Sequence, residues 1–420
     1  MKTSTRAVLG IALAAVVLVA AAFWLGRGGD SAGRTVLRMR IWDASFVPVY
    51  RDSLAAFERV NPDVRVEVTV VPWASYPQKL RLDVSGGTAD DLFWTNAFED
   101  YADAGRLIPI DGSIGDAAGW DASAVAQYTR GGRLWAVPQF VDGGTAVFYN
   151  RDLLAAAGVD PGEVGSARWG SGDGDEFTGL LRRLAAVAPY AYNAGGDFQS
   201  LELPYLGSAG GRFQDGERFV FDEPPGVVAF SYLRGLIAQG LAPSAADTNG
   251  SGDFAKTAFL QGKMALFQSG TFNLAQIAEQ ARFGWGVAML PSGPAGRVST
   301  NNAIGVAGNA ATRHPDAVRR VLAWLGSAAG NRFVGENGTT VPAVLADQPI
   351  YREYWSRKGI DVRPFFDVLT GPRIASGGGP GFPAALKAIE PILAEMFLGR
   401  TPVPDALHRA RAAAERAAHP

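Results

Sequence analysis

The segment 132–161 constrains the fold of this chain more than any other. It reads GRLWAVPQFVDGGTAVFYNRDLLAAAGVDP, a short aromatic strand that continues through Asp142 into a β-rich run at 145–149. Asn150 can then cap a helix, and Gly158 can end it. This order predicts a chain that leaves one α/β lobe as a strand, enters a second lobe as another strand and starts a helix there.

Strands and helices alternate before this segment. The hydrophobic patterns predict strands at 35–42, 64–71 and 91–95, and helices at 47–61 and 76–85. Such alternation is typical of a parallel α/β sheet. Each strand ends in, or is followed by, polar or aromatic residues, namely Asp43, Trp73, Trp94 and Asn96. Because ligands of open α/β sheets bind outside the carboxyl ends of the strands, these four residues are candidate ligand contacts.

Residues 132–154 combine a G-R-L-W-A-V-P strand, an acidic residue and a Y-N-R-D-L-L helix start. This pattern resembles the first interlobe crossing of the extracellular solute-binding proteins of carbohydrate ABC importers, the maltodextrin-binding-like family 1. Further similar blocks stand in the family's order at 89–111, 258–273 and 284–341. The resemblance covers most of 36–420, and it implies an α/β fold of the periplasmic-binding-protein type with a ligand cleft between two lobes.

The resemblance also implies how the chain is divided. We expect the first lobe at 36–141 and 292–335, and the second lobe at 142–291 and 336–420. A strand at 303–307 would return the chain from the second lobe to the first. Several crossings between two lobes place a ligand at the domain interface.

Additional ligand contacts follow from the same resemblance. Asp142 matches an acidic residue that accepts hydrogen bonds from sugar hydroxyls, and a hinge salt bridge is the structural alternative. Phe272 matches an aromatic residue that stacks on the sugar, where the family more often has Trp. The other candidates at the crossing and in the second lobe are Asp197, Phe198, Asn301, Asn302 and Phe382.

These residue types suit a carbohydrate for a physical reason. A sugar presents apolar C–H faces, which pack against planar rings, and a rim of hydroxyl groups, which bond to carboxylates and amides. Each candidate also has a structural interpretation. Trp94 can pack in the core, Asn96 can cap a helix, and Asn301 and Asn302 can form a turn.

The first residues of the chain predict export. Residues 7–25 form an apolar run behind Lys2 and Arg6, so 1–26 is expected to be a cleaved signal peptide or a retained membrane anchor. A polar linker would follow at 27–35. The chain contains no cysteine, which excludes disulfides and a lipid anchor on cysteine. We therefore expect the protein in the cell envelope, anchored at the outer face of the cytoplasmic membrane, or secreted.

Several functions lack the residues that they need. A net charge of −2 gives no electrostatic footprint for nucleic acid. The three histidines, His314, His408 and His419, lie outside the predicted cleft loops, which argues against a Ser-His-Asp triad or a zinc site. No phosphate-binding loop of an ATPase is present, and we expect no cofactor or metal.

Two classes of function remain after these exclusions. The resemblance implies a binding protein, not an enzyme, that captures a sugar or oligosaccharide and delivers it to the transmembrane subunits of an ABC permease. A binding protein for another polyol, such as a glycerophosphodiester, is a variant of this hypothesis. The alternative is a cell-envelope carbohydrate hydrolase that uses two carboxylates, drawn from Asp142, Asp197 and Glu336. A weaker third hypothesis is a sensory or scaffold protein.

Overall fold

The computed structural model describes residues 33–73, 75–142, 144–170, 172–248, 253–300, 302–378 and 381–418. The expected leader at 1–26 and most of the expected linker lie outside these ranges, while Thr35 of that linker already belongs to the first strand. Within the described ranges, no helix combines the length and the apolar character needed to cross a lipid bilayer.

The first lobe is built on a six-stranded sheet with the order β14-β6-β13-β3-β1-β2. Strands β1, β2 and β3 run parallel, as the alternating pattern predicts. Strand β13 runs antiparallel to β3 and β6, because the chain re-enters this lobe at the end of the sheet where β6 left it. The bounds of the six strands are β1 Thr35–Ile41, β2 Val64–Val70, β3 Leu92–Thr95, β6 Val137–Val141, β13 Ala303–Gly308 and β14 Val341–Pro342.

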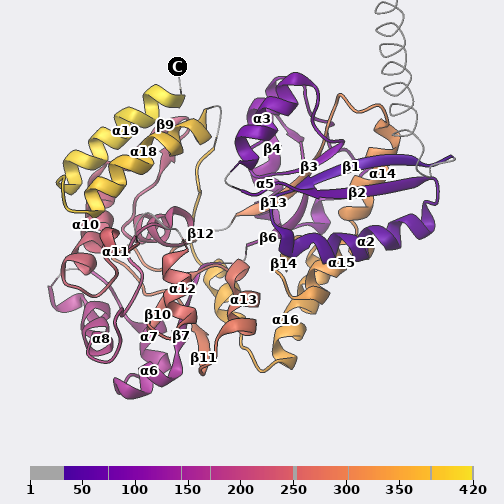
Figure 1. Ribbon diagram of the computed structural model, residues 1–420. Helices are drawn as coiled ribbons and strands as arrows, with labels where there is room; N and C mark the ends of the chain where they lie inside the picture. The colour runs from indigo at the N-terminus through magenta and orange to yellow at the C-terminus, as the bar shows by residue number, and fades with distance from the viewer. Residues whose placement is uncertain are drawn as a thin grey trace, which may run out of the picture.

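Amphipathic helices pack against this sheet. In α2 (Val47–Val60) the residues Tyr50, Leu54 and Phe57 follow each other at intervals of three or four and share the buried face. Figure 1 shows α2, α14 and α15 beside β1 and β2 in the lobe on the right. The other helices of this lobe are α3 Tyr76–Gly86, α4 Glu99–Asp103, α5 Ala122–Tyr128, α14 Pro315–Leu325, α15 Ala328–Asn337 and α16 Gln348–Arg357.

The second lobe contains a smaller antiparallel sheet with the order β10-β7-β11. Phe148 in the central strand pairs with Phe267 on one side and with Val287 on the other. Helices α18 and α19 pack against each other at the outer left of Figure 1. The bounds are β7 Ala146–Asn150, β10 Leu266–Ser269, β11 Trp285–Ala288, α6 Arg151–Ala156, α7 Pro161–Ser166, α8 Glu176–Ala185, α9 Leu203–Ser208, α10 Pro224–Ala238, α11 Ala245–Thr248, α12 Phe254–Leu260, α13 Leu274–Gln280, α18 Phe382–Phe397 and α19 Val403–Ala418.

The segment 132–161 forms the crossing that its sequence predicts. Strand β6 belongs to the first sheet and β7 to the second. The side chain of Asn150 accepts hydrogen bonds from the backbone N–H groups of Asp152 and Leu153, which caps α6. Gly158 follows this helix with a φ of 64°, a left-handed conformation that glycine adopts without strain.

The strand pairings move two of the expected lobe boundaries. Strand β12 (Ser299–Thr300) pairs with β15 (Arg373–Ile374) in the second lobe, so the chain returns to the first lobe between β12 and β13 and not at 291–292. Strand β14 pairs with β6 in the first lobe, and α15 and α16 pack there too. The last crossing therefore lies after α16 and not at 335–336, because buried strands and helices hold 336–357 in the first lobe.

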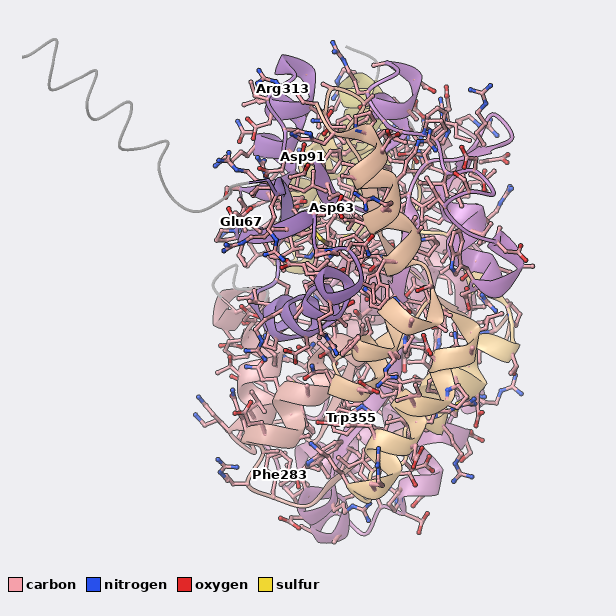
Figure 2. All side chains as sticks on the ribbon, turned by 90° about the vertical axis from the view of Figure 1, so that its right-hand side faces the viewer. Asp63, Glu67, Asp91, Phe283, Arg313 and Trp355 are labelled. Carbon is pink, nitrogen blue, oxygen red and sulfur yellow. The ribbon has the colours of Figure 1, made fainter. Side chains whose placement is uncertain are left out.

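Two hydrophobic cores lie in the described residues. One fills the first lobe and extends past the crossings to Phe148 and Phe267, and the other fills the rest of the second lobe. The ring of Phe148 lies 5.5 Å from that of Phe365 in α17 (Arg363–Asp367), and the N–H of Gly144 at the first crossing donates to the Phe365 carbonyl. Figure 2 shows Arg313 towards the upper end of the molecule and Phe283 towards the lower end, with Asp63 and Trp355 between them.

Candidate functional site

Four strands of the first lobe end at the same edge of the sheet. Strands β1, β2 and β3 are parallel, and β6 has the same direction because β13 runs antiparallel to both β3 and β6. The residues that follow these strands are Trp42 and Asp43, Trp73, Asn96, and Asp142. Polar and aromatic groups therefore gather at the edge where the chain crosses to the second lobe.

Three tryptophans form an aromatic cluster at this edge. The ring of Trp42 lies 5.2 Å from that of Trp73 and 4.8 Å from that of Trp94. Trp73 is 51% exposed and Trp42 is half-buried, so both present ring area to solvent. Trp94 is fully buried, and its indole N–H donates to the hydroxyl of Tyr50 at 2.7 Å. Trp94 supports the cluster from the core, and we do not include it among the proposed ligand contacts.

Asp43 and Asn96 are both exposed. The carboxylate of Asp43 accepts a hydrogen bond from the backbone N–H of Ser45 at 2.8 Å and so caps a short helical turn, η1 (Ala44–Phe46). One of its oxygens thus has a local structural role, although a carboxylate can accept further bonds from a ligand. Asn96 does not cap α4; it precedes Phe98, which occupies the cap position.

Asp142 lies at the first crossing and contacts two other segments, one at Asn302 in the second crossing and one at Thr271 in the second lobe. Its backbone N–H donates to the carbonyl of Asn302 at 2.8 Å, and its carboxylate accepts from the Asn302 side chain at 3.3 Å. The hydroxyl of Thr271 donates to the Asp142 carbonyl. Burial raises the pKa of Asp142 to about 7, and the bond from Asn302 lowers it in part. No salt bridge involves Asp142 among the described residues, in contrast to the structural alternative that the sequence left open.

A group of hydroxyls lies beside Asp142 in the second lobe. The Thr145 N–H donates to the hydroxyl of Ser299 at 2.8 Å, and the hydroxyls of Thr145 and Thr300 lie 3.1 Å apart. All three residues are buried. These bonds hold the first and second crossings together on the side of the second lobe, next to Asn302.

The second lobe contributes a π-helical turn, η4 (Phe198–Glu202). Asp197 caps this turn, because its carboxylate accepts from the backbone N–H of Ser200 at 2.8 Å. Asp197 and Phe198 are half-buried, and the Phe198 ring packs edge-on against Phe213 at 4.8 Å. The π-turn also connects to the crossing, since the hydroxyl of Thr300 donates to the carbonyl of Gln199 at 3.0 Å. Single π-turns are frequent at functional sites.

The remaining candidates differ in their exposure. Phe272 is 46% exposed and directly follows Thr271, which is bonded to Asp142. Gly270 leaves room for its ring, since a Cβ there would lie 2.5 Å from the ring. Phe382 is only 9% exposed and packs in the core of the second lobe near Phe213, so a primarily structural role fits it better. Asn301 lies outside the described residues.

Sequence reasoning missed several residues of this junction. Trp42 follows β1 directly and could have been found by the same rule that selected Asp43. Thr145, Ser299 and Thr300 offered no signal, because isolated hydroxyl residues occur throughout loops and their proximity depends on tertiary structure. Glu336, which the hydrolase alternative needed, lies on α15 in an ion pair with Arg332 at 2.9 Å.

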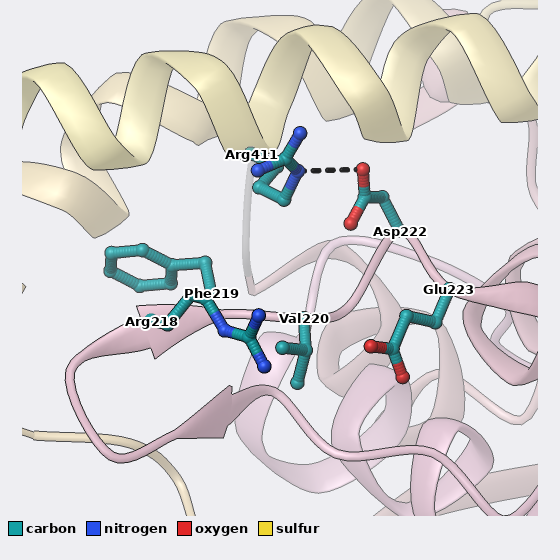
Figure 3. A pocket seen from close by; sticks show the side chains of 6 residues that line it. All are labelled: Arg218, Phe219, Val220, Asp222, Glu223 and Arg411. Carbon is teal, nitrogen blue, oxygen red and sulfur yellow. Dashed lines mark hydrogen bonds and ion pairs between the residues drawn. The ribbon is translucent and has the colours of Figure 1, made fainter.

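A separate pocket lies between strand β9 (Arg218–Phe219) and helix α19, and Figure 3 shows the residues that line it. Its volume is about 210 Å³. The guanidinium of Arg411 donates to Asp222 at 2.7 Å, so these two charged groups of the pocket neutralise each other. This arrangement gives no indication of a ligand. The described residues also contain no group of three or more His, Asp or Glu side chains that could hold a metal ion.

Two α/β lobes, joined by paired crossings with aromatic rings and acceptor groups beside them, define the class of two-lobe binding proteins. A family model described as "Bacterial extracellular solute-binding protein" matches residues 43–332, which is more than half of the chain. The chain belongs to this family.

Individual relatives agree with this assignment. UspC of M. tuberculosis is 52% identical to this chain, with a TM-score of 0.78 over 91% of this chain and 100% of UspC. An ABC substrate-binding protein from Listeria monocytogenes, solved in complex with cycloalternan, has a TM-score of 0.80 and 17% identity over 91% of this chain and 98% of that protein, a likeness of fold alone. A protein of Brucella abortus, described as a binding protein, is 26% identical over 280 residues, 64% of this chain and 66% of its own length. The family and the two-lobe α/β fold predicted from the sequence are therefore confirmed.

Proposed function

We propose that this protein is the substrate-binding component of an ABC importer, and that it captures a sugar or oligosaccharide between its lobes for delivery to a membrane permease. The observation that supports this most is the chemistry of the junction. Exposed rings come from both lobes, Trp73 from the first and Phe272 from the second, and an acceptor and an amide group lie at the crossings, at Asp142 and Asn302. Rings suit the C–H faces of a sugar, and acceptors suit its hydroxyls.

The proposed mechanism is lobe closure. In the open form each lobe offers half of the site, and a ligand that bonds to both halves favours the closed form. Asp142 is placed to act in both states, because it belongs to the crossing itself. In this mechanism the ligand is released without any chemical change. A hydrolase would instead release a cleaved product. The complex with cycloalternan, an oligosaccharide ligand of a protein with the same fold, is consistent with this class of ligand.

The proposal also includes a location and partners. We place the protein in the cell envelope, at the outer face of the cytoplasmic membrane or secreted, with the N-terminal apolar segment as its signal peptide or anchor. Its partners would be a carbohydrate and the transmembrane subunits of the permease. A retained anchor would raise the effective concentration of the protein at its permease.

A thermal-shift screen tests the proposal. The protein without residues 1–34 is tested against maltodextrins, trehalose, amino sugars, chito-oligosaccharides and glycerophosphodiesters, and each ligand that raises Tm is then examined for cleavage. A ligand at a hundredfold excess over its Kd adds about 2.7 kcal/mol of stability, which is a clear shift.

The outcomes separate the alternatives. A saturable shift with intact sugar supports the binding function and names the class of sugar. A shift with cleavage assigns the protein to the hydrolases. A shift with glycerophosphodiesters alone replaces the sugar with another polyol, and no shift with any compound contradicts the ligand class that we propose.

A further inference from the structure

Glu202 is a buried carboxyl group that the proposed binding site does not use directly. It lies at the end of the π-turn η4 and is only 4% exposed. An ionised carboxylate in such a place is costly unless hydrogen bonds compensate for the lost water. The hydrogen bonds of Glu202 are therefore expected to offset the cost of burying its carboxyl group.

Glu202 is bonded at two points to the loop that precedes the π-turn. Its carboxylate accepts a hydrogen bond from the backbone N–H of Gly196 at 3.1 Å. Its own backbone N–H donates to the carbonyl of Asp197, also at 3.1 Å. Gly196 has a φ of 80°, so the chain reverses here in a conformation that favours glycine. Together these two hydrogen bonds restrain the backbone from Gly196 to Glu202, and so they restrain the orientation of Asp197.

Hydrogen bonds from other elements hold the body of the turn. The Gln268 side chain donates to the carbonyl of Ser200 at 2.8 Å, and Thr300 donates to the carbonyl of Gln199. The loop before the turn rests instead on the Glu202 carboxylate and on the ring of Phe397 near Gly195. Glu202 thus supplies a polar anchor at the end of the turn that carries Asp197.

The charge of Asp197 also affects the carboxyl group of Glu202. Burial and the nearby charge of Asp197 together raise the pKa of Glu202 to about 7, and burial raises the pKa of Asp197. The side chains that pack against the turn, Phe213, Gln268, Thr300 and Phe397, carry no charge. Near Gln268, burial raises the pKa values of the Tyr192 and Tyr205 hydroxyls well above 10, so both hydroxyls stay neutral.

We propose that Glu202 is a positioning residue for the candidate site: its carboxylate holds the 195–198 loop in place and thereby fixes the position of Asp197, which we assign to the ligand. The inference rests on the proposed function only in assigning Asp197 to the ligand. The anchoring of the loop and the coupling of the two carboxyl groups are properties of the ligand-free protein, and they are tested without a sugar.

Three variants separate the anchor from the charge. Glu202→Gln keeps an oxygen that can accept from Gly196 but removes the charge, and Glu202→Met removes both while keeping the length of the side chain. Glu390→Gln, at an exposed position on α18, is the matched control. Hydrogen exchange of the peptide that spans 195–202 is measured by mass spectrometry. Titration of ¹³C-labelled glutamate carboxyl groups is followed by NMR in the unchanged protein and in Asp197→Asn, with Glu202→Gln to assign the signal.

We expect Glu202→Met to accelerate exchange in 195–198 by about tenfold, since a lost hydrogen bond of about 1.4 kcal/mol has this effect, and Glu202→Gln to change it by less than about threefold. In Asp197→Asn the titration midpoint of Glu202 should fall by about one pH unit, because a neighbouring negative charge is gone. A merely structural role would not move this midpoint.

Unchanged exchange in a folded Glu202→Met protein would overturn the anchor, and an unchanged Glu202 midpoint in Asp197→Asn would overturn the coupling. If Glu202→Met does not fold, Glu202→Asp takes its place, because the shorter side chain withdraws the carboxylate from Gly196, and unchanged exchange in 195–198 of that variant overturns the anchor. A failed sugar screen would leave these results intact and remove only the assignment of Asp197 to a ligand.

Discussion

The two lobes build their halves of the candidate site in different ways. The first lobe uses the ends of parallel strands, which bring Trp42, Trp73 and Asn96 to one edge of a sheet. The second lobe uses a capped π-turn and a glycine that makes room for Phe272. The first half follows from a general rule of α/β sheets, whereas the second depends on local turns and on buried side-chain bonds. The difference suggests that the first half is rigid and that ligand selection depends more on the second.

The largest effect should come from the residue that serves both lobes. We expect Asp142→Ala to weaken binding of the most stabilising sugar of the panel by roughly a hundredfold, because a desolvated charged acceptor of hydrogen bonds is lost. Titration calorimetry measures this, with Glu390→Ala as a surface control. A loss below threefold would show that the lobes bind independently and that the crossing has no direct part.

The first crossing is the next most sensitive position. In Gly144→Ala the new Cβ would lie 2.0 Å from a Val368 methyl group and 2.7 Å from the Phe365 carbonyl oxygen. We expect a loss of about 1–3 kcal/mol in the free energy of unfolding, as for other overpacked sites. Gly179→Ala in α8 has open space around it and should be neutral or stabilising. Equal stability of the two variants in urea unfolding would mean that α17 does not restrain the crossing.

The charge of Asp142 should make binding depend on pH. A sugar hydroxyl donates better to the ionised carboxylate, and the pKa of Asp142 in the ligand-free protein is about 7. Affinity should therefore rise by about tenfold from pH 6 to pH 8 and then level off. Asp142→Asn should remove this slope. A slope that persists in Asp142→Asn would assign the effect to Asp197 and Glu202 in the second lobe.

The same shift predicts the opposite trend for stability without ligand. A carboxyl whose pKa is higher in the folded than in the unfolded state binds its proton more tightly when folded, so stability is greatest on the acid side. It should fall as the pH rises from about 4, the unfolded value, to about 7. Thermal unfolding across this range checks the sign, and Asp142→Asn should flatten the curve. Stability that instead rises across this range would contradict the raised pKa values of the junction.

The smallest effects compare one ring from each lobe. Trp73→Ala and Phe272→Ala should each weaken binding by about fivefold, since half-exposed rings contribute roughly 1 kcal/mol through stacking. Neither variant should change Tm by much, because both rings are exposed. Trp94→Phe should do the reverse, lowering Tm through the lost bond to Tyr50 while affecting affinity little. If Trp94→Phe reduces affinity more than Trp73→Ala, the ligand contacts the cluster at a different ring.

The sequence predicted the first lobe well because its information is local and periodic. Hydrophobic spacing located β1, α2, β2, α3 and β3, and the rule of strand ends led to Asp43 and Trp73. It could not rank Trp73 above Trp94, since exposure depends on which ring the core encloses. It also misplaced the boundary at 291–292, because the pairing of β12 with β15 joins residues far apart in the chain. The cluster of hydroxyl side chains at Thr145, Ser299 and Thr300 arises from such long-range contacts.

The alignment of the crossings has a consequence for the time course of binding. At the first two crossings Val141 lies level with Ala303, and the Asp142 N–H donates to the carbonyl of Asn302. Two chain segments that are hydrogen-bonded side by side resist shear and twist between the lobes. Bending of one lobe towards the other about these segments is then the easiest motion. Opening and closing should then reduce to one angle. Dyes on the two lobes should report a single exponential relaxation, in which a ligand alters the rates but adds no further phase.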